Sequence, residues 1–330
     1  MNQNPDAKAL GIDLGGTKIL SAVINSRGEI LARDYSITPV GQECDAVIAA
    51  IAESVKNTLD QACISISELV TIGLAVSGLS NPESGILFTS PHIPGMKDVP
   101  ILELIEKKLG KKTFLINDAN AAAFGEMHCG AARGYRNIIY ITLSTGIGGG
   151  IVIDGKIYTG TIGTAGEIGH MTINDEGPLC DCGNRGCWET LASGTALARE
   201  AVRRIKEGAE TSILHHAGEN LEKITAREVH AAALENDSLA KELIAMTGYY
   251  FGVGLANLVN IFNPEIIVIG GGLSNIADML LKPAYKEAEK RAFNQPYRSV
   301  RFARAGLGEN SGVIGAAVFA LGEIERSENQ

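Results

Sequence analysis

The chain has 330 residues, of which 45% are apolar, and a net charge of −9 at pH 7. This length allows one large domain or two ordinary ones. The acidic balance argues against nucleic acid or an anionic membrane surface as a partner, because neutralising phosphates needs a basic face. The chain opens with M-N-Q-N-P-D-A-K, which is no apolar signal segment, and isolated cysteines at positions 44, 63 and 129 suit a reducing compartment. We therefore expect a cytoplasmic protein.

Residues 10–24, L-G-I-D-L-G-G-T-K-I-L-S-A-V-I, form two apolar runs around a pair of glycines, which predicts a β-hairpin. Glycines in such a turn let backbone N–H groups approach an anion closely, and Asp13 at the end of the first run could hold a metal ion through water. The Walker pattern is absent, and the alternative is a plain tight turn. The candidate anion-binding residues are Gly15, Gly16, Thr17 and Lys18.

The next part of the chain alternates helical and strand patterns. Apolar spacing predicts helices at 44–62, 101–109 and 121–129, and buried strands at 69–76 and 113–116. The first of these strands ends in Ser77-Gly78, and the second ends in N-D-A-N, from Asn117 to Asn120. Open α/β sheets place ligand chemistry at the carboxyl ends of their strands, so these polar residues are candidate site residues.

The second half of the chain repeats the design of the first. Residues 137–157 again predict a strand, a Gly/Thr turn at 144–149 and a strand, and residues 266–274 resemble 70–78. This predicts an internally duplicated fold in which the two glycine turns grip a polyphosphate from both sides. The glycines at 270–272 follow a strand and could admit a flat ring such as adenine.

Further helices are expected at 193–206, from Thr225 with Glu228 completing a capping box, and at 312–321. Residues 207–223 are polar and predict a surface excursion. Residues 239–262 are long and apolar enough to span a membrane. Polar residues interrupt this stretch, so we expect a buried helix, closely packed through its glycines.

One stretch, from Glu167 to Glu189, gathers four potential metal ligands: His170, Cys180, Cys182 and Cys187. One imidazole and three thiolates suit a closed tetrahedral zinc site, which leaves no position for a catalytic water and is therefore structural. Cys180 and Cys182 are separated by one residue rather than the usual two to four. A labile disulfide or three unrelated buried thiols are the alternatives.

Glu167 and Glu189 flank these ligands. A zinc-bound histidine keeps its second ring nitrogen protonated, so His170 could donate to a ligand hydroxyl while the two glutamates accept from others. The stretch would then be a polyol-binding surface held in shape by metal. The alternative is that both glutamates are solvated loop charges.

Taken together, D-L-G-G-T-K, N-D-A-N, S-T-G-I-G-G-G, E-I-G-H and C-D-C-G-N-R-G-C-W-E resemble the ROK family, which groups repressors, uncharacterised proteins and sugar kinases. The likeness covers residues 10–321, and the cysteine signature resembles bacterial ATP-dependent glucokinases in particular. It implies an α/β fold of the duplicated, actin-like ATPase type (ribonuclease H-like), with two lobes around a cleft. Residues 1–118 plus about 306–330 would form the small lobe, and 119–305 the large lobe with the zinc loop.

The resemblance also implies roles for individual residues. Asp118 matches the family's catalytic base, and Asp13 with Gly15 to Lys18 matches the first phosphate segment. The implied sugar contacts are Gly78, Asn117, Asp118, Glu167, His170 and Glu189. The implied nucleotide contacts of the second half are Thr145, Gly146 and Gly271. The zinc ligands would be His170, Cys180, Cys182 and Cys187. The chain departs from the family pattern at residues 91–96, where it reads P-H-I-P-G-M and family kinases often read P-N-x-x-G-W.

We therefore expect a hexose kinase that transfers the γ-phosphoryl group of ATP, with Mg²⁺, to the 6-hydroxyl of glucose. N-acetylmannosamine and N-acetylglucosamine are alternative substrates, and polyphosphate is an alternative donor. A sugar-responsive ROK repressor is the alternative of another class, disfavoured by the nine residues before Leu10, and a non-catalytic sugar sensor is a third. A homodimer or higher homo-oligomer is typical of the family.

Overall fold

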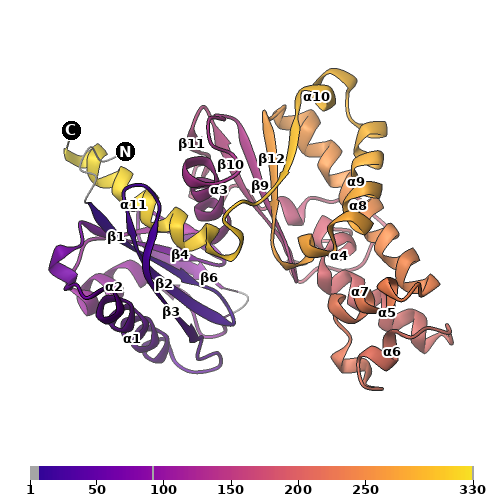
Figure 1. Ribbon diagram of the computed structural model, residues 1–330, viewed down its shortest axis with the longest axis horizontal. Coiled ribbons are helices and arrows are strands. Elements are labelled where there is room, and N and C mark those ends of the chain that lie inside the picture. Colours follow the sequence, from indigo (N-terminus) through magenta and orange to yellow (C-terminus); the bar gives the residue numbers. More distant parts are fainter. Residues whose placement is uncertain (1–6, 91–92, 329–330) are drawn as a thin grey trace. The chain divides into compact units, whose positions relative to one another are not determined.

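The computed structural model describes residues 7–90 and 93–328, which form two five-stranded sheets with helices and a small third sheet (Figure 1). The first sheet has the order β3-β2-β1-β4-β8. Its strands are β1 (Lys8–Leu14), β2 (Lys18–Asn25), β3 (Ile30–Ile37), β4 (Thr71–Val76) and β8 (Thr113–Asn117). β1, β2 and β3 are antiparallel neighbours, whereas β4 runs parallel to both β1 and β8.

The second sheet has the order β11-β10-β9-β12-β13. Its strands are β9 (Ile138–Leu143), β10 (Ile147–Ile153), β11 (Lys156–Ile157), β12 (Ile266–Gly270) and β13 (Arg301–Arg304). Each sheet thus places a three-strand meander at one edge and two crossover strands beside its first strand, and β12 and β13 are parallel like β4 and β8. The internal duplication predicted from the repeated glycine turns is confirmed by this shared strand order.

Helices cover both faces of the first sheet. On one face, α1 (Cys44–Ala62) and α2 (Ile101–Leu109) close an aliphatic core over Leu10, Ile12 and Leu14. On the other face, α3 (Asp118–Cys129) and α11 (Ser311–Glu328) pack against Ala9, Leu20 and Ala22. Apolar residues at both parities of β1 and β2 are buried, as expected for central strands with both faces covered. A third sheet joins β5 (Leu79–Asn81), β6 (Ile86–Thr89) and β7 (Lys97–Val99).

The chain forms two compact units. The first contains residues 1–140, 150–166 and 305–330, and the second contains residues 141–149 and 167–304. The lobe division expected at residue 118 stays a prediction. The helices of the second unit are α4 (Trp188–Ala192), α5 (Gly194–Lys206), α6 (Ile213–His216), α7 (Ala226–Leu234), α8 (Ser238–Phe262), α9 (Ala277–Arg291) and α10 (Asn294–Ser299).

Helix α8 is the core helix of the second unit. A Cβ atom at Gly248 would lie 2.4 Å from the carbonyl oxygen of Leu280, and one at Gly252 the same distance from that of Ala284. The glycines therefore let α8 and α9 touch backbone to backbone, as expected from the sequence. Among the described residues, α8 is the one helix long and apolar enough to cross a bilayer, but 56% of its apolar window is buried. A buried core helix meets the same criteria, so this is a weak indication of a membrane span.

The structure corrects two expected boundaries. Helix α3 begins at Asp118 rather than at residue 121, because the Asn117 side chain accepts hydrogen bonds from the backbone N–H groups of Ala119 and Asn120 and caps the helix there. The excursion at 207–223 is not all surface, since α6 lies within it and Ile213 is fully buried. The capping box of Thr225 and Glu228 at the start of α7 is confirmed.

Candidate functional site

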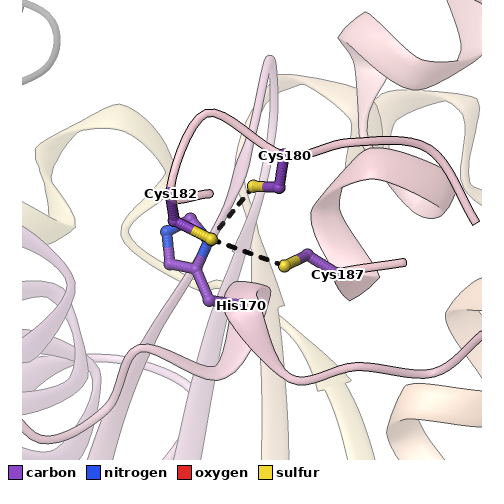
Figure 2. Close-up of side chains that lie close together, drawn as sticks. All are labelled: His170, Cys180, Cys182 and Cys187. Carbon is purple, nitrogen blue, oxygen red and sulfur yellow. Dashed lines mark hydrogen bonds between the residues drawn. The ribbon is translucent and has the colours of Figure 1, made fainter. Parts of the chain in front are cut away.

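Four side chains of the second unit converge on one point. Figure 2 shows His170, Cys180, Cys182 and Cys187 pointing toward one another, and their potential ligand atoms all lie within 4.8 Å of one another. The Sγ atoms of Cys182 and Cys187 are 3.7 Å apart, and Cys180 Sγ is 3.5 Å from His170 Nδ1. A tetrahedral zinc ion with bonds of about 2.3 Å to sulfur and about 2.0 Å to nitrogen would place its ligands about 3.5–3.8 Å apart. The residues present therefore fit a zinc ion.

Tight turns and a buried indole hold this loop in place. Gly183 and Gly186 have φ angles of +90° and +64°, and a Cβ atom at Gly186 would lie 1.4 Å from a backbone oxygen of Asn174. Trp188, next to the last cysteine, is fully buried, stacks on Phe251 at 5.1 Å and donates from Nε1 to the carbonyl oxygen of Tyr250. The loop is thereby fixed to α8 on its cysteine-bearing side.

The imidazole of His170 presents its two nitrogens to different partners. Nδ1 faces the thiols, and Nε2 lies 3.9 Å from Oε2 of Glu167, with both side chains roughly half exposed. The pKa of Glu167 is raised above its ordinary value, mainly by burial. The neighbouring His170 opposes this shift, and the charge of Glu189 adds to it. With a metal ion on Nδ1, Nε2 would carry a proton, so one N–H donor would lie close to two carboxylates, which is a suitable chemistry for binding vicinal hydroxyl groups.

Glu189 is also joined to the second glycine turn. Its Oε2 accepts a hydrogen bond of 2.8 Å from the backbone N–H of Ile147, and a Cβ atom at Gly146 would lie 2.2 Å from the same oxygen. The carbonyl oxygens of Ser144 and Thr145 accept from the first N–H groups of helix α5. The expected nucleotide turn and an expected sugar contact are therefore one connected piece of structure within the second unit.

Gly271, the expected adenine contact, directly follows β12 with a φ of +87°. A Cβ atom there would lie 2.4 Å from the carbonyl oxygen of Leu143, so the backbone passes close to the strand that leads into the 144–146 turn. The structure brings this glycine beside the turn in the second unit.

In the first unit, Asp13 lies at the end of β1 near a second carboxylate. Burial and the charge of Asp118 raise the pKa of Asp13 to about 7, and Lys18 lowers it. The turn from Gly15 to Lys18 is closed by a bond from the Gly15 N–H to the carbonyl oxygen of Lys18, and Thr38 hydrogen-bonds the carbonyl oxygen of Gly15. A buried carboxylate whose pKa is raised by a second carboxylate favours a cation between or beside the two. Gly16 and Thr17 lie within this turn.

Asp118 is the first residue of α3, directly after the cap Asn117. Nδ2 of Asn117 donates to Oδ1 of Asp118 at 3.0 Å and to the carbonyl oxygen of Gly78 at 3.4 Å. Gly78 has a φ of +115°, which a non-glycine residue adopts at a cost. The ends of β4 and β8 therefore bring Gly78, Asn117 and Asp118 together, as the strand-end argument predicts.

The ROK family model matches residues 9–323. The chain belongs to the ROK family. It is 39% identical to a glucokinase of Halalkalibacterium halodurans over 93% of this chain and 92% of that one, and 36% identical to a glucokinase of Streptomyces coelicolor over 94% and 96%. A xylose repressor of Caldicellulosiruptor bescii is 30% identical over 96% of this chain and 78% of its own length.

Solved ROK structures have the same architecture. A ROK family glucokinase of Streptomyces griseus, in complex with glucose and AMPPNP, superposes with a TM-score of 0.84 at 31% identity, covering 96% of this chain and 100% of that one. A ROK hexokinase of Thermus thermophilus gives 0.80 at 34% identity, over 97% and 99%. The actin-like ATPase fold expected from the sequence is thereby confirmed.

Two further features lie near the strand-end glycine, the loop that departs from the ROK pattern and a group of buried serines that the sequence did not single out. In the departing P-H-I-P-G-M loop, Pro91 and His92 lie outside the described residues, whereas Met96 is buried in the core of the first unit. The buried hydroxyls of Ser77, Ser80 and Ser90 have no hydrogen-bond partner among the described residues. Only the position of Ser77, beside the strand-end glycine, hints in the sequence that this region is polar inside.

Proposed function

We propose that this protein is an ATP-dependent hexose kinase that phosphorylates glucose at its 6-hydroxyl. The observation that carries the proposal is the similarity to glucokinases at 34–39% identity, which extends over 93–95% of the chain and 92–97% of those relatives. The chain is a sugar kinase by this criterion, and ATP with a divalent cation are its implied co-substrate and cofactor.

The catalytic group of this proposal is Asp118, which would accept the proton of the attacking hydroxyl. Phosphoryl transfer passes through a loose transition state, so orienting the nucleophile matters more than strong basicity. The bond from Asn117 Nδ2 fixes the Asp118 carboxylate, and that amide with Gly78 would contact a sugar hydroxyl. Asp13 would hold a magnesium ion through water, and such an ion would neutralise charge that develops on the phosphate oxygens.

Sugar recognition is assigned to Glu167, His170 and Glu189 of the second unit. A zinc ion on the four ligands would keep the thiols deprotonated and the imidazole oriented, with Nε2–H available as a donor. The donor set has no open position, so the metal serves the shape of the site rather than the reaction. Phosphate contacts would come from residues 15–18 and from Thr145 and Gly146, with Gly271 beside the adenine.

A coupled ADP-release assay over a panel of hexoses and N-acetylhexosamines tests the proposal, with ATP and polyphosphate as alternative donors. Turnover with glucose and MgATP at a kcat/KM at least about tenfold above the other sugars is the expected result. Preference for N-acetylmannosamine or N-acetylglucosamine would move the substrate assignment. We also propose a cytoplasmic homodimer or higher homo-oligomer, which sedimentation in solution would test.

A repressor is the second candidate, because xylose repressors match 96% of this chain at 30–31% identity. That candidate predicts sugar-dependent binding to promoter DNA in a gel-shift assay and no turnover in the ADP-release assay. The acidic net charge of −9 makes such binding weak by electrostatics alone.

A further inference from the structure

One carboxylate of the first unit is completely buried and is not part of the proposed chemistry. Glu126, on α3, has no exposed surface, and its two oxygens accept four hydrogen bonds. Oε2 accepts from the backbone N–H groups of Ala131 at 2.7 Å and Gly306 at 2.9 Å, and Oε1 accepts from the N–H of Leu307 at 2.9 Å and the hydroxyl of Ser311 at 2.8 Å. A buried carboxylate without such donors would be very costly, so the four bonds form one unit.

Three of the four donors belong to the segment that leads into α11. Gly306 and Leu307 lie where the chain re-enters the first unit at residue 305, and Ser311 is the first residue of the helix. Helices α3 and α11 also touch directly, since a Cβ atom at Gly125 would lie 2.5 Å from the carbonyl oxygen of Ser311. Glu126 therefore holds the start of α11 against α3, at a place where the two helix backbones are in close contact.

Each of these helices begins at or beside a carboxylate of the proposed site. Asp118 begins α3, eight residues or about 12 Å of helix before Glu126. Gly312, in the first turn of α11, approaches Asp13 so closely that a Cβ atom there would lie 2.7 Å from Asp13 Oδ2. The N-terminal end of a helix carries a partial positive charge, which favours a carboxylate at that place. The pairing of β1, β4 and β8 fixes the backbone of Asp13 relative to that of Asn117 and Asp118, and the start of α11 limits where the Asp13 carboxylate can lie.

We propose that Glu126 is a positioning residue for phosphoryl transfer, which aligns the carboxylate of Asp13 with Asp118 by fixing the start of α11 against α3. The inference rests on the proposed kinase function. It assigns to Glu126 an effect on the rate of the chemical step and on the binding of the metal–nucleotide. The sugar contacts of the second unit do not depend on Glu126. A purely structural role predicts instead a loss of stability without a selective loss of kcat.

The test compares Glu126→Gln with Glu106→Gln, a matched change at a second carboxylate that accepts a backbone N–H, that of Thr113 at 2.9 Å, in the same unit. An amide at position 126 turns its NH₂ group either toward the N–H groups of Ala131 and Gly306 or toward the N–H of Leu307 and the hydroxyl of Ser311. In both orientations a backbone N–H of the segment before α11 loses its acceptor, so the start of α11 must shift. Since a misplacement of about 1 Å can cost about 100-fold in rate, we expect kcat to fall about 10- to 100-fold in Glu126→Gln, with the KM for glucose within about twofold of the parent. Glu106→Gln should keep kcat within about twofold.

Glu126→Gln with an unchanged kcat, or with kcat and glucose KM changed as in a global loosening, would overturn the proposal. If that variant does not fold, Ser311→Ala decides the matter, because it removes one donor and leaves every charge in place. We expect about a threefold to tenfold loss of kcat there, and no loss would refute the role. If the parent turns over no sugar, the kinase function fails by itself. A crystal structure of Ser311→Ala then tests the alignment, and an Asp13 carboxylate in an unchanged place relative to Asp118 would contradict it.

Discussion

Replacing Gly146 by alanine should weaken glucose binding, because the added methyl group displaces the carboxylate of Glu189. The new Cβ atom would lie 2.2 Å from Oε2 of Glu189 and 3.1 Å from its Cδ, where ordinary contact begins near 3.4 Å. The clashing atom is the end of a flexible side chain, so the protein folds and the carboxylate retreats by about 1 Å, the difference between contact and clash. That retreat breaks the 2.8 Å bond from the N–H of Ile147.

The size of the effect follows from the hydrogen bond that the displaced Glu189 carboxylate would no longer accept from a glucose hydroxyl. A hydrogen bond to a charged group is worth about 1.5–3 kcal/mol net, which corresponds to about a 10- to 150-fold change in an equilibrium constant. We expect the KM for glucose in a coupled ADP-release assay, and the Kd by calorimetry, to rise within that range. Gly322→Ala is the control, because a Cβ atom there meets nothing within 4 Å.

A double-mutant cycle shows whether the effect passes through Glu189. In a Glu189→Ala background the clash is absent, so adding Gly146→Ala should change the KM for glucose by less than about twofold, the scatter expected for independent sites. If Gly146→Ala costs the same factor in both backgrounds, the turn does not act on the sugar through this carboxylate, and the connection between them has no functional meaning.

Three other perturbations separate the roles proposed for single side chains. Cys182→Ser should lose its zinc by elemental analysis and raise the KM for glucose about 10- to 100-fold through a misplaced His170; metal-free protein with a normal KM would contradict this coupling. Asp118→Ala should lower kcat about 100- to 10,000-fold while calorimetry still detects glucose binding, and substantial turnover would remove Asp118 from its role. Asp13 must be ionised to hold a cation, so kcat/KM for MgATP should fall as the pH drops through about 7, the pKa of Asp13. Lys18→Met removes the charge that lowers this pKa and should therefore move the fall to higher pH. A fall at unchanged pH would rule out Asp13 as the titrating group.

The duplicated architecture could be predicted because each half repeats a pattern with a physical meaning. Glycine turns between apolar runs predicted the hairpins β1–β2 and β9–β10, and the similar runs at 70–78 and 266–274 predicted the strands beside them. The edge strand β3 was not predicted, because its pattern is the reverse of the usual one. Its exposed face carries Leu31, Tyr35 and Ile37, whereas its half-buried face includes Asp34 and Ser36.

The candidate site likewise contains residues that the sequence could predict and residues that it could not. Cysteines clustered within eight residues predict their own proximity, since a short loop can bring them together without knowledge of the fold. Glu126 carries no such signal, because its partners Gly306, Leu307 and Ser311 are about 180 residues away along the chain. In the sequence it reads as one more glutamate of a helix, a residue type that is mostly exposed, and only tertiary structure shows that it is buried.

Three consecutive residues join the loop of potential metal ligands to Glu189, one of the proposed sugar contacts. The thiol of Cys187 points to the other ligands, the indole of Trp188 packs into α8 against Gly254, where a Cβ atom would lie 2.0 Å from the ring, and the carboxylate of Glu189 binds the 144–147 turn. The three residues adjoin at the start of the short helix α4, so the backbone that carries the Cys187 thiol also carries Glu189. A zinc ion that fixes Cys187 would therefore also fix Glu189, without contacting it. The same metal would orient His170 directly, so a structural ion suits the proposed task of this site, which is the recognition of hydroxyl groups.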